Sequence, residues 1–147
     1  MNIGNLFFNW SGRINRAKFW LASLICLVVW GTVELSALML MKGFDIPEGA
    51  VLPLAFAFWL PQVLLVIPMT AIGINRLHDR AKSGWWLLLF GVVPAVIHAV
   101  SSHIALLVAS LMISIWALVE MGCLRGTIGP NRYGDDPLAL QPRPIVV

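Results

Sequence analysis

Charged residues are scarce in this sequence. Asp, Glu, Lys and Arg make up 12% of its 147 residues, whereas they supply about 25% of a typical soluble domain. Hydrophobic residues instead reach 59%, and the mean hydropathy is +0.85. A fold of this length could not bury that much apolar surface away from water. The composition therefore excludes a water-soluble globular domain and predicts a membrane protein.

Cysteine is also rare. Cys26 lies within an apolar run and Cys123 lies near the end of another. Two cysteines placed in this way form neither a disulfide framework nor a metal-ligand spacing, and we interpret them as small core residues. We expect no redox chemistry, no resident metal and no cofactor.

The sequence contains four long apolar runs. They cover about residues 19–41, 51–74, 85–100 and 104–124. Each is near the roughly 20 residues that a helix needs to cross the hydrocarbon of a bilayer. Only Ser101–His103 separates the third run, which is the shortest, from the fourth, and this predicts a tight antiparallel hairpin. The predicted fold is an all-α membrane protein with four transmembrane helices in a single domain, residues 1–147.

A cleaved signal peptide is the alternative for the first run. That run is too long for a signal peptide, Glu34 interrupts it, and no convincing small-residue cleavage site is present. We expect the first helix to be retained.

Positive charge is confined to three stretches. Nine of the ten Lys and Arg residues lie within 13–18, 76–82 and 125–143, and the turn between the first two apolar runs is acidic. Lys- and Arg-rich loops stay in the cytoplasm, so this pattern predicts that both termini are cytoplasmic. The net charge of +3 is too small and too local for a nucleic-acid binder. The basic loops instead indicate contact with anionic lipid headgroups.

An amphipathic segment precedes the first apolar run. Its hydrophobic residues recur at helical spacing: Ile3, Leu6, Phe7, Trp10 and Ile14. This spacing is typical of a helix that lies in the membrane interface, and we expect Ser11 and Gly12 to interrupt it. We interpret the segment as an anchor for the first helix.

Three polar segments flank the apolar runs. They read SGRINRAKFW at 11–20, RLHDRAKSGWW at 76–86 and RGTIGPNRYGDDP at 125–137. Together they resemble the domain of unknown function 805 family, the YhaH-like small inner membrane proteins of bacteria. In that family the motifs GRxxRxxFW, RLHDxxxSGWW and GTxGxNxYGxDP flank four predicted spans. The resemblance covers nearly the whole chain and implies a multi-pass protein of the bacterial inner membrane. It implies no activity, because the family has none established.

Two positions depart from the family pattern. Ala81 and Asp135 stand where the family more often has Gly and Pro. We expect the turn geometry of both segments to differ slightly for this reason.

The middle segment contains a predicted anion site. Ser83 is expected to cap the third helix, whose first N–H groups point toward the cytoplasm beside nearby guanidinium groups. Such a helix N-terminus suits a phospholipid phosphate, and Trp85 would seat the helix at the interface. The predicted anion- or lipid-binding residues are Arg13, Arg16, Arg76, Arg80, Ser83 and Trp85. The alternative is that these basic residues serve only to fix the topology.

The third segment is rich in Gly, Pro and Asn, which predicts successive turns beneath the helices. Its acids would pair with Arg13, Arg16 or Arg76, and Tyr133 would pack on interfacial Trp residues. Asp79 is expected to pair with Arg76 or Arg80, and Glu120 with Arg125 or a loop arginine. The predicted cytoplasmic clasp comprises His78, Asp79, Arg132, Tyr133, Asp135 and Asp136.

A divalent metal is the sharper alternative for part of this clasp. His78, Asp79, Asp135 and Asp136 are ligand types for Mg²⁺ or Zn²⁺. They lack a specific ligand spacing, and a structural clasp is the preferred interpretation.

Polar residues within the apolar runs are few. Glu34 and His98 fall at similar depths on the first and third helices, and we expect a hydrogen bond between them to relieve the cost of burying each in the membrane. Gln62 is a further intramembrane polar residue. An acid near an imidazole could relay protons, and the alternative role for both is adhesion between helices.

Three classes of function remain open. The first is a noncatalytic membrane protein whose cytoplasmic face binds anionic lipid or a protein partner, with a homo-oligomer as one possibility. The second is a transporter or channel subunit that uses Glu34 and His98. The third is a lipid-headgroup enzyme, for which no nucleophile, metal cluster or phosphate motif is visible. We choose the first and expect no enzymatic activity.

Overall fold

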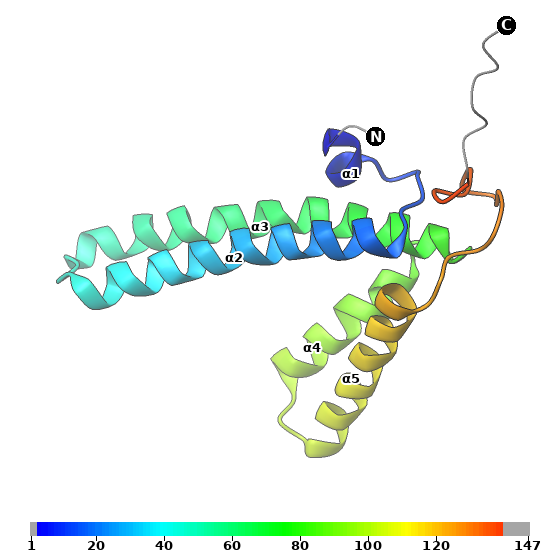
Figure 1. The fold of residues 1–147 in the computed structure, drawn as a ribbon. Coiled ribbons are helices and arrows are strands. Elements are labelled where there is room, and N and C mark those ends of the chain that lie inside the picture. Colours follow the sequence, from blue (N-terminus) through cyan, green and yellow to red (C-terminus); the bar gives the residue numbers. More distant parts are fainter. Residues whose placement is uncertain (1–2, 140–147) are drawn as a thin grey trace, which may run out of the picture.

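The computed structural model describes residues 3–139 and consists of helices joined by short turns (Figure 1). The elements, in chain order, are α1 (Ile3–Phe8), α2 (Arg16–Gly43), α3 (Glu48–Asp79), the π-helix η1 (Leu88–Val92), α4 (Val93–Val100), α5 (Ile104–Ala117) and the π-helix η2 (Leu118–Cys123). Arg143, the last residue of the third basic stretch, lies outside the described residues.

The two longest helices form an antiparallel hairpin. The side chain of Asn15 accepts a hydrogen bond from the backbone N–H of Lys18, at 2.9 Å, and so caps the start of α2. α2 has 28 residues and α3 has 32, which corresponds to about 42 and 48 Å of helix. A turn at 44–47 joins them.

The second hairpin is shorter. α4, which continues η1, packs antiparallel to α5, which continues into η2. The turn at 101–103 joins them, as predicted. In both π-helices the backbone bonds skip one residue more than in an α-helix, and η2 carries the chain to its exit at Leu124.

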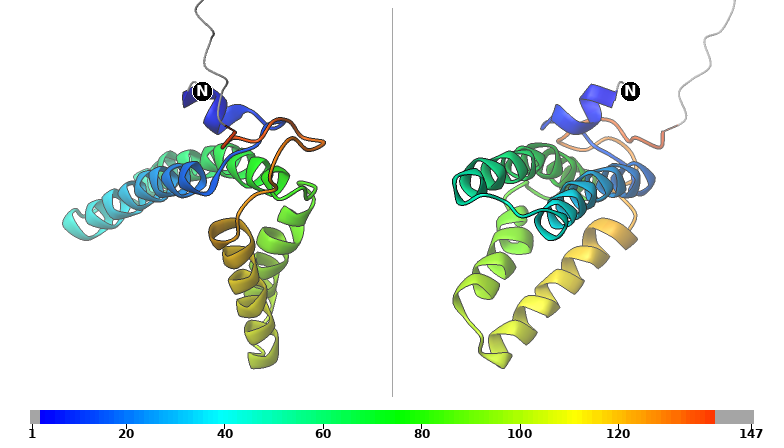
Figure 2. Two further views of the ribbon diagram at one scale, coloured as in Figure 1. Left: turned by 45° about the vertical axis from the view of Figure 1, so that its right-hand side comes forward. Right: turned by 90° about the vertical axis from the view of Figure 1, so that its left-hand side faces the viewer.

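The two hairpins meet at one end and diverge at the other (Figures 1 and 2). At the meeting point the glycines allow close approach. A Cβ on Gly73 would lie 2.8 Å from Leu87, and one on Gly122 would lie 2.6 Å from the ring of Trp20. Both distances are shorter than carbon atoms tolerate, so these glycines set how closely the hairpins can approach one another.

The predicted spans correspond to these helices in part. α2, α3 and the continuous helix Ile104–Cys123 are long and apolar enough to cross a membrane. The third predicted span corresponds to the apolar helix Leu88–Val100, which is shorter. All of the predicted boundaries fall within a few residues of the observed ones except at the end of α3, which extends to Asp79.

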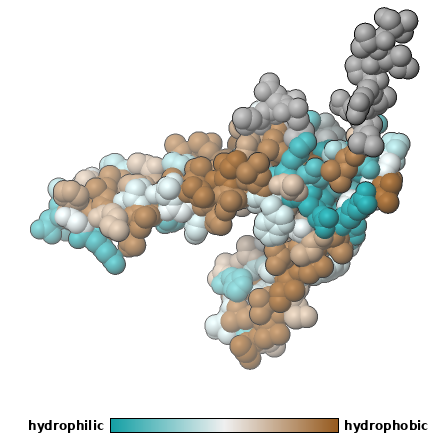
Figure 3. All heavy atoms as spheres, in the orientation of Figure 1, coloured by the Kyte–Doolittle hydropathy of each residue, from teal (hydrophilic) through white to brown (hydrophobic). Residues whose placement is uncertain are grey.

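Hydrophobic side chains cover the outside of both hairpins, whereas polar side chains gather where the hairpins meet and at the far turn of α2 and α3 (Figure 3). A small core lies at the meeting point. It contains Leu6, Ile14, Ala22, Cys26 and Ile72. The predicted amphipathic segment is helical only as far as Phe8, and α1 packs on α3 through this core.

Candidate functional site

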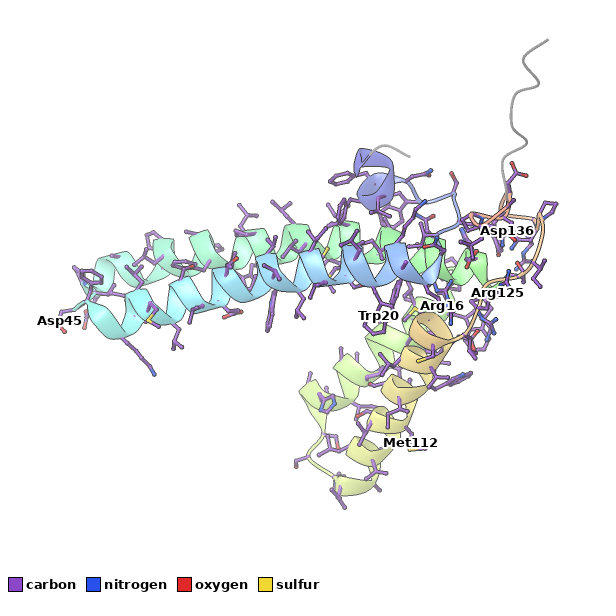
Figure 4. All side chains as sticks on the ribbon, in the orientation of Figure 1. Arg16, Trp20, Asp45, Met112, Arg125 and Asp136 are labelled. Atoms are coloured by element: carbon purple, nitrogen blue, oxygen red, sulfur yellow. The ribbon has the colours of Figure 1, made fainter. Side chains whose placement is uncertain are left out.

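All three motif segments meet at the end of the molecule where the hairpins join (Figure 4). We call this region the polar junction and define it as residues 9–16, 75–82 and 120–136. Its elements are the chain before α2, the last turn of α3 with the turn that follows, and η2 with the tail. The tail passes beside Asp79: Thr127 donates its N–H to the Asp79 carbonyl at 2.8 Å.

The RLHD sequence is helical, which corrects the expectation of a loop. Asn75, Arg76, His78 and Asp79 are all buried and belong to the last turns of α3. The helix continues past the apolar run because other segments satisfy these polar side chains. Asn75, for example, accepts from the Gly12 N–H at 2.9 Å and donates to the Asn9 carbonyl at 2.5 Å.

A buried Arg–Asp–Arg cluster lies at the centre of the junction. The Asp79 carboxylate contacts Arg13 at 3.1 Å and Arg76 at 2.5 Å, and the side chains of all three residues are at most 3% exposed. Arg13 also donates to the carbonyls of Thr127, Gly129 and Gly134. The partnership of Asp79 with Arg76 was predicted, but its bridge to Arg13 was not.

The C-terminal end of η2 is capped by side chains. A helix leaves its last carbonyls without internal partners. Here the last three carbonyls of η2, at 121–123, and the two that follow, at 124–125, each accept a hydrogen bond from another element. The donors, in order of carbonyl, are Arg76, Trp20, Arg16, Arg76 again and Arg80. Four of these five bonds come from guanidinium groups, whose charge suits the negative end of a helix dipole. This capping joins α2 and α3 to the second hairpin.

Tyr133 stacks on His78 and not on an interfacial Trp. The two rings are 3.8 Å apart and nearly parallel, and the Arg132 guanidinium lies 4.7 Å from the centre of the Tyr133 ring. Asn131 donates to the His78 carbonyl at 3.0 Å. The predicted turns of the tail are confirmed, with Gly129 and Gly134 at positive φ.

Glu120 pairs with two cations. Its carboxylate accepts from Arg80 at 2.9 Å and lies 3.3 Å from Lys82. Arg80 is the loop arginine that was anticipated, whereas Arg125 contributes only its carbonyl. The Lys82 ammonium also lies 4.5 Å from the Trp86 ring centre, a cation–π distance.

The prediction that the tail acids pair with arginine is wrong. Among the described residues neither Asp135 nor Asp136 forms an ion pair, because Asp79 already occupies Arg13 and Arg76. Asp136 instead accepts from the N–H groups of Leu138 and Gly129, and these two bonds lower its pKa. No three His, Cys, Asp or Glu side chains within residues 3–139 gather as a metal site.

The predicted anion site is also rearranged. The side chains of Arg76 and Arg13 are buried, and their guanidinium groups bind Asp79 and backbone carbonyls in place of an external anion. The Ser83 hydroxyl lies 3.5 Å from the Trp85 N–H, which is a weak cap. Arg16 and Trp85 are exposed, and the pocket beside Arg16 and Arg125 encloses about 10 Å³, room for one water molecule.

Ala81 adopts a left-handed conformation, with φ at 55°. A residue with a Cβ is strained there and glycine is not. The alanine at this turn after α3 therefore carries backbone strain that a glycine would not.

Glu34 and His98 do not form the expected hydrogen bond. Glu34 accepts from Gln62 at 2.7 Å, and Gln62 accepts from Trp30 at 3.2 Å. In the short hairpin, His98 of α4 lies 3.1 Å from the Ser110 hydroxyl of α5. The two residues belong to different hairpins, which diverge away from the polar junction.

Sequence reasoning missed three junction residues, namely Asn75, Gly126 and Thr127. Asn75 was detectable as a polar residue at the end of an apolar run, one position before Arg76. Gly126 has no comparable signal, because its role depends on a contact with Asp79 from a distant segment.

Comparison with known proteins assigns this sequence to a family. Residues 7–135 match a family described as "Protein of unknown function (DUF805)". No solved structure matches. In Escherichia coli K12, inner membrane protein YhaI is 33% identical over 131 residues, which covers 89% of this chain and 87% of YhaI. Inner membrane protein YhaH is 28% identical over 127 residues, with 86% and 84% covered.

A third relative in the same organism, the uncharacterized protein YiiR, is 33% identical over 150 residues and covers 92% of this chain and 90% of its own length. The matched region contains the first two motif segments, the third as far as residue 135, and every helix from α2 to η2. YhaI and YhaH are inner membrane proteins, and this chain has helices that can span a bilayer. The chain is a multi-pass inner membrane protein and belongs to the DUF805 family.

Proposed function

We propose that this protein is a noncatalytic membrane protein whose polar junction lies at the cytoplasmic face and binds anionic lipid headgroups. The observation that carries the proposal is the separation of two kinds of arginine. Arg13 and Arg76 are buried and tie the segments together, whereas Arg16, Arg125 and Arg132 are exposed around them.

The charge distribution supports a cytoplasmic junction. Within residues 3–139, eight Lys and Arg residues lie in or beside the junction against four Asp and Glu residues. The opposite turn has Lys42 against Asp45 and Glu48. Cytoplasmic loops of membrane proteins carry such an excess of Lys and Arg.

The polar junction, as the described residues form it, has no opening the size of a substrate, and this supports a noncatalytic role. Every buried side-chain nitrogen and oxygen in residues 3–139 has a hydrogen-bond partner. The pocket at the junction is one water in size, whereas small-molecule sites usually enclose about 300–1,000 Å³. The buried charges therefore serve to hold segments together.

The orientation is tested with single cysteines. A cysteine at Asp135, in a background with Cys26→Ala and Cys123→Ala, should resist a membrane-impermeant maleimide in intact cells and react after permeabilisation. The control, Asp45→Cys in the same background, should react in intact cells. Labelling of the Asp135 site from outside would contradict a cytoplasmic junction.

Lipid binding is tested by neutralising exposed cations. Arg125→Gln with Arg132→Gln should weaken binding of phosphatidylglycerol about thirty-fold, because each surface cation contributes about 1 kcal/mol at an anionic membrane. Native mass spectrometry of the detergent-solubilised protein, titrated with phosphatidylglycerol or phosphatidylcholine, measures the effect. Lys42→Gln, at the opposite turn, should leave phosphatidylglycerol binding within about twofold, since a single cation contributes little at a face of net negative charge.

Equal phosphatidylglycerol affinity in the double variant and the parent would reject the proposed lipid surface. Equal affinity of the parent for phosphatidylcholine would do so as well, because the proposal requires discrimination by headgroup charge.

A further inference from the structure

A carboxylate lies on the outside of the long hairpin. Glu34 is exposed on α2 and, within the described residues, has one hydrogen-bond partner, Gln62 of α3. Both residues lie well inside helices that cross the membrane. Lipid chains offer a carboxylate no donor, and an ionisable group facing hydrocarbon is costly. Such a group is expected to have a protein partner.

The helical repeat shows which way this pair faces. Glu34 follows Trp20 by 14 residues, close to four turns of helix, so both project from one side of α2. Trp20 contacts Gly122 of η2. On α3, Gln62 precedes Gly73 by 11 residues, close to three turns. Gly73 contacts Leu87 in the short hairpin. Glu34 and Gln62 therefore face the side on which the short hairpin lies.

That side of the long hairpin is uncovered beyond the junction. The hairpins diverge (Figures 1 and 2), and α4 packs against α5 and η1. Leu24, Leu27 and Leu38, which share the face of Trp20, are 56%, 58% and 47% exposed. Glu34 and Gln62 are therefore polar residues on an uncovered face that is otherwise apolar.

The chain itself carries a suitable hydrogen-bonding group at the matching depth. His98 on α4 follows Leu87 by 11 residues, and Gln62 precedes Gly73 by the same number. Leu87 and Gly73 are in contact. His98 and Gln62 each lie about 16 Å along their own helix from that contact, so they lie at similar depth. His98 is exposed, and its Nε2 atom lies 3.1 Å from the Ser110 hydroxyl. The Ser110 hydroxyl donates its one proton to the Leu107 carbonyl at 2.9 Å, so it accepts from the Nε2–H of His98, and Nδ1 is left for a further hydrogen bond.

We propose that two copies of this chain associate in the membrane, with Nδ1 of His98 in each copy hydrogen-bonded to the Glu34 carboxyl group of the other and one proton held between them. A two-fold axis along the bilayer normal keeps equivalent residues at equal depth and repeats each contact twice. The two arms diverge within one chain, so the partner for Glu34 is on a second copy. Membrane interfaces of this kind are held by close packing and by hydrogen bonds between helices.

Cross-linking tests the contact with Glu34 and His98 left in place. Gly31 and Ala95 lie one turn nearer the junction than Glu34 and His98 respectively, and a Cβ at Gly31 meets nothing within 4 Å. In the background with Cys26→Ala and Cys123→Ala, differently tagged Gly31→Cys and Ala95→Cys chains are co-expressed and oxidised in native membranes. A heterodimer that dithiothreitol cleaves is expected. The matched control pairs Ala95→Cys with Val29→Cys, which lies on the opposite face of α2 at nearly the same depth, and should give little product.

A double-mutant cycle tests the hydrogen bond. Association of labelled chains in bilayers, measured by energy transfer, should weaken about tenfold for Glu34→Leu and for His98→Leu, and the double variant should be no weaker than either. A parent that stays monomeric at every protein-to-lipid ratio would overturn the proposal, as would cross-linking through Val29→Cys alone. Additive effects in the cycle would overturn the pairing of Glu34 with His98.

Discussion

Asp79→Ala should lower the free energy of unfolding by about 3–5 kcal/mol, the cost typical of removing one partner from a buried ion pair. Its carboxylate is the shared partner of two buried guanidinium groups, those of Arg13 and Arg76. Without it, two cations remain close together away from water. Unfolding in detergent, followed by tryptophan fluorescence against added dodecyl sulfate, measures the loss.

Two further variants make this result specific. Asp79→Asn keeps the shape of the side chain and some hydrogen bonds, so it should lose less than Asp79→Ala. Asp135→Ala removes an exposed carboxylate that has no ion-pair partner among the described residues, and should unfold like the parent. A stability of Asp79→Ala within about 1 kcal/mol of the parent, near the ordinary effect of a point substitution, would show that the cluster does not hold the junction together.

Gly126→Ala should cost about 3 kcal/mol, at the upper end of the usual penalty for overpacking. A Cβ at this position would collide with the carboxylate of Asp79. The carboxylate cannot move aside, because Arg13 and Arg76 bind it on both oxygens and Thr127 holds the Asp79 carbonyl. The same unfolding assay applies.

Because of this collision, we expect the effects of Asp79→Ala and Gly126→Ala on the free energy of unfolding to be non-additive. In an Asp79→Ala background the carboxylate is gone, so Gly126→Ala should add much less than it does in the parent. Gly31→Ala is the matched control, since a Cβ there meets no atom within 4 Å, and alanine is the better helix former. Full additivity of Asp79→Ala and Gly126→Ala would place the cost of the methyl group elsewhere.

The helices were predictable because hydropathy and length determine them. An apolar run of about 20 residues has few alternatives to a membrane helix, and the short 101–103 turn allowed only a hairpin. The end of α3 was not predictable in the same way. Asn75, Arg76, His78 and Asp79 look like loop residues in isolation, and they become helical because partners from both ends of the chain satisfy them.

The ion pairs within the polar junction could not be predicted from the spacing of charged residues along the sequence. The sequence offers Asp79, Asp135 and Asp136 as equivalent carboxylates, yet only Asp79 lies on a helix face between two arginines. The capping of the η2 carbonyls could not be predicted for a similar reason, because the side chains of η2 do not indicate which residues will donate to its backbone. Glu34 and His98 lie on helices that the hydropathy predicted, but the divergence of the hairpins decided their partners.

The unequal lengths of the two hairpins bear on how the protein responds to membrane thickness. The arms of the long hairpin, with 28 and 32 residues, exceed a hydrocarbon layer of about 30 Å, whereas the helix Ile104–Cys123 matches it. The long arms must tilt to fit while the short ones stand nearer the bilayer normal. With the arms fastened at a single vertex, a thinner bilayer would spread them and a thicker one would draw them together, so the opening between them reports the thickness of the surrounding lipid.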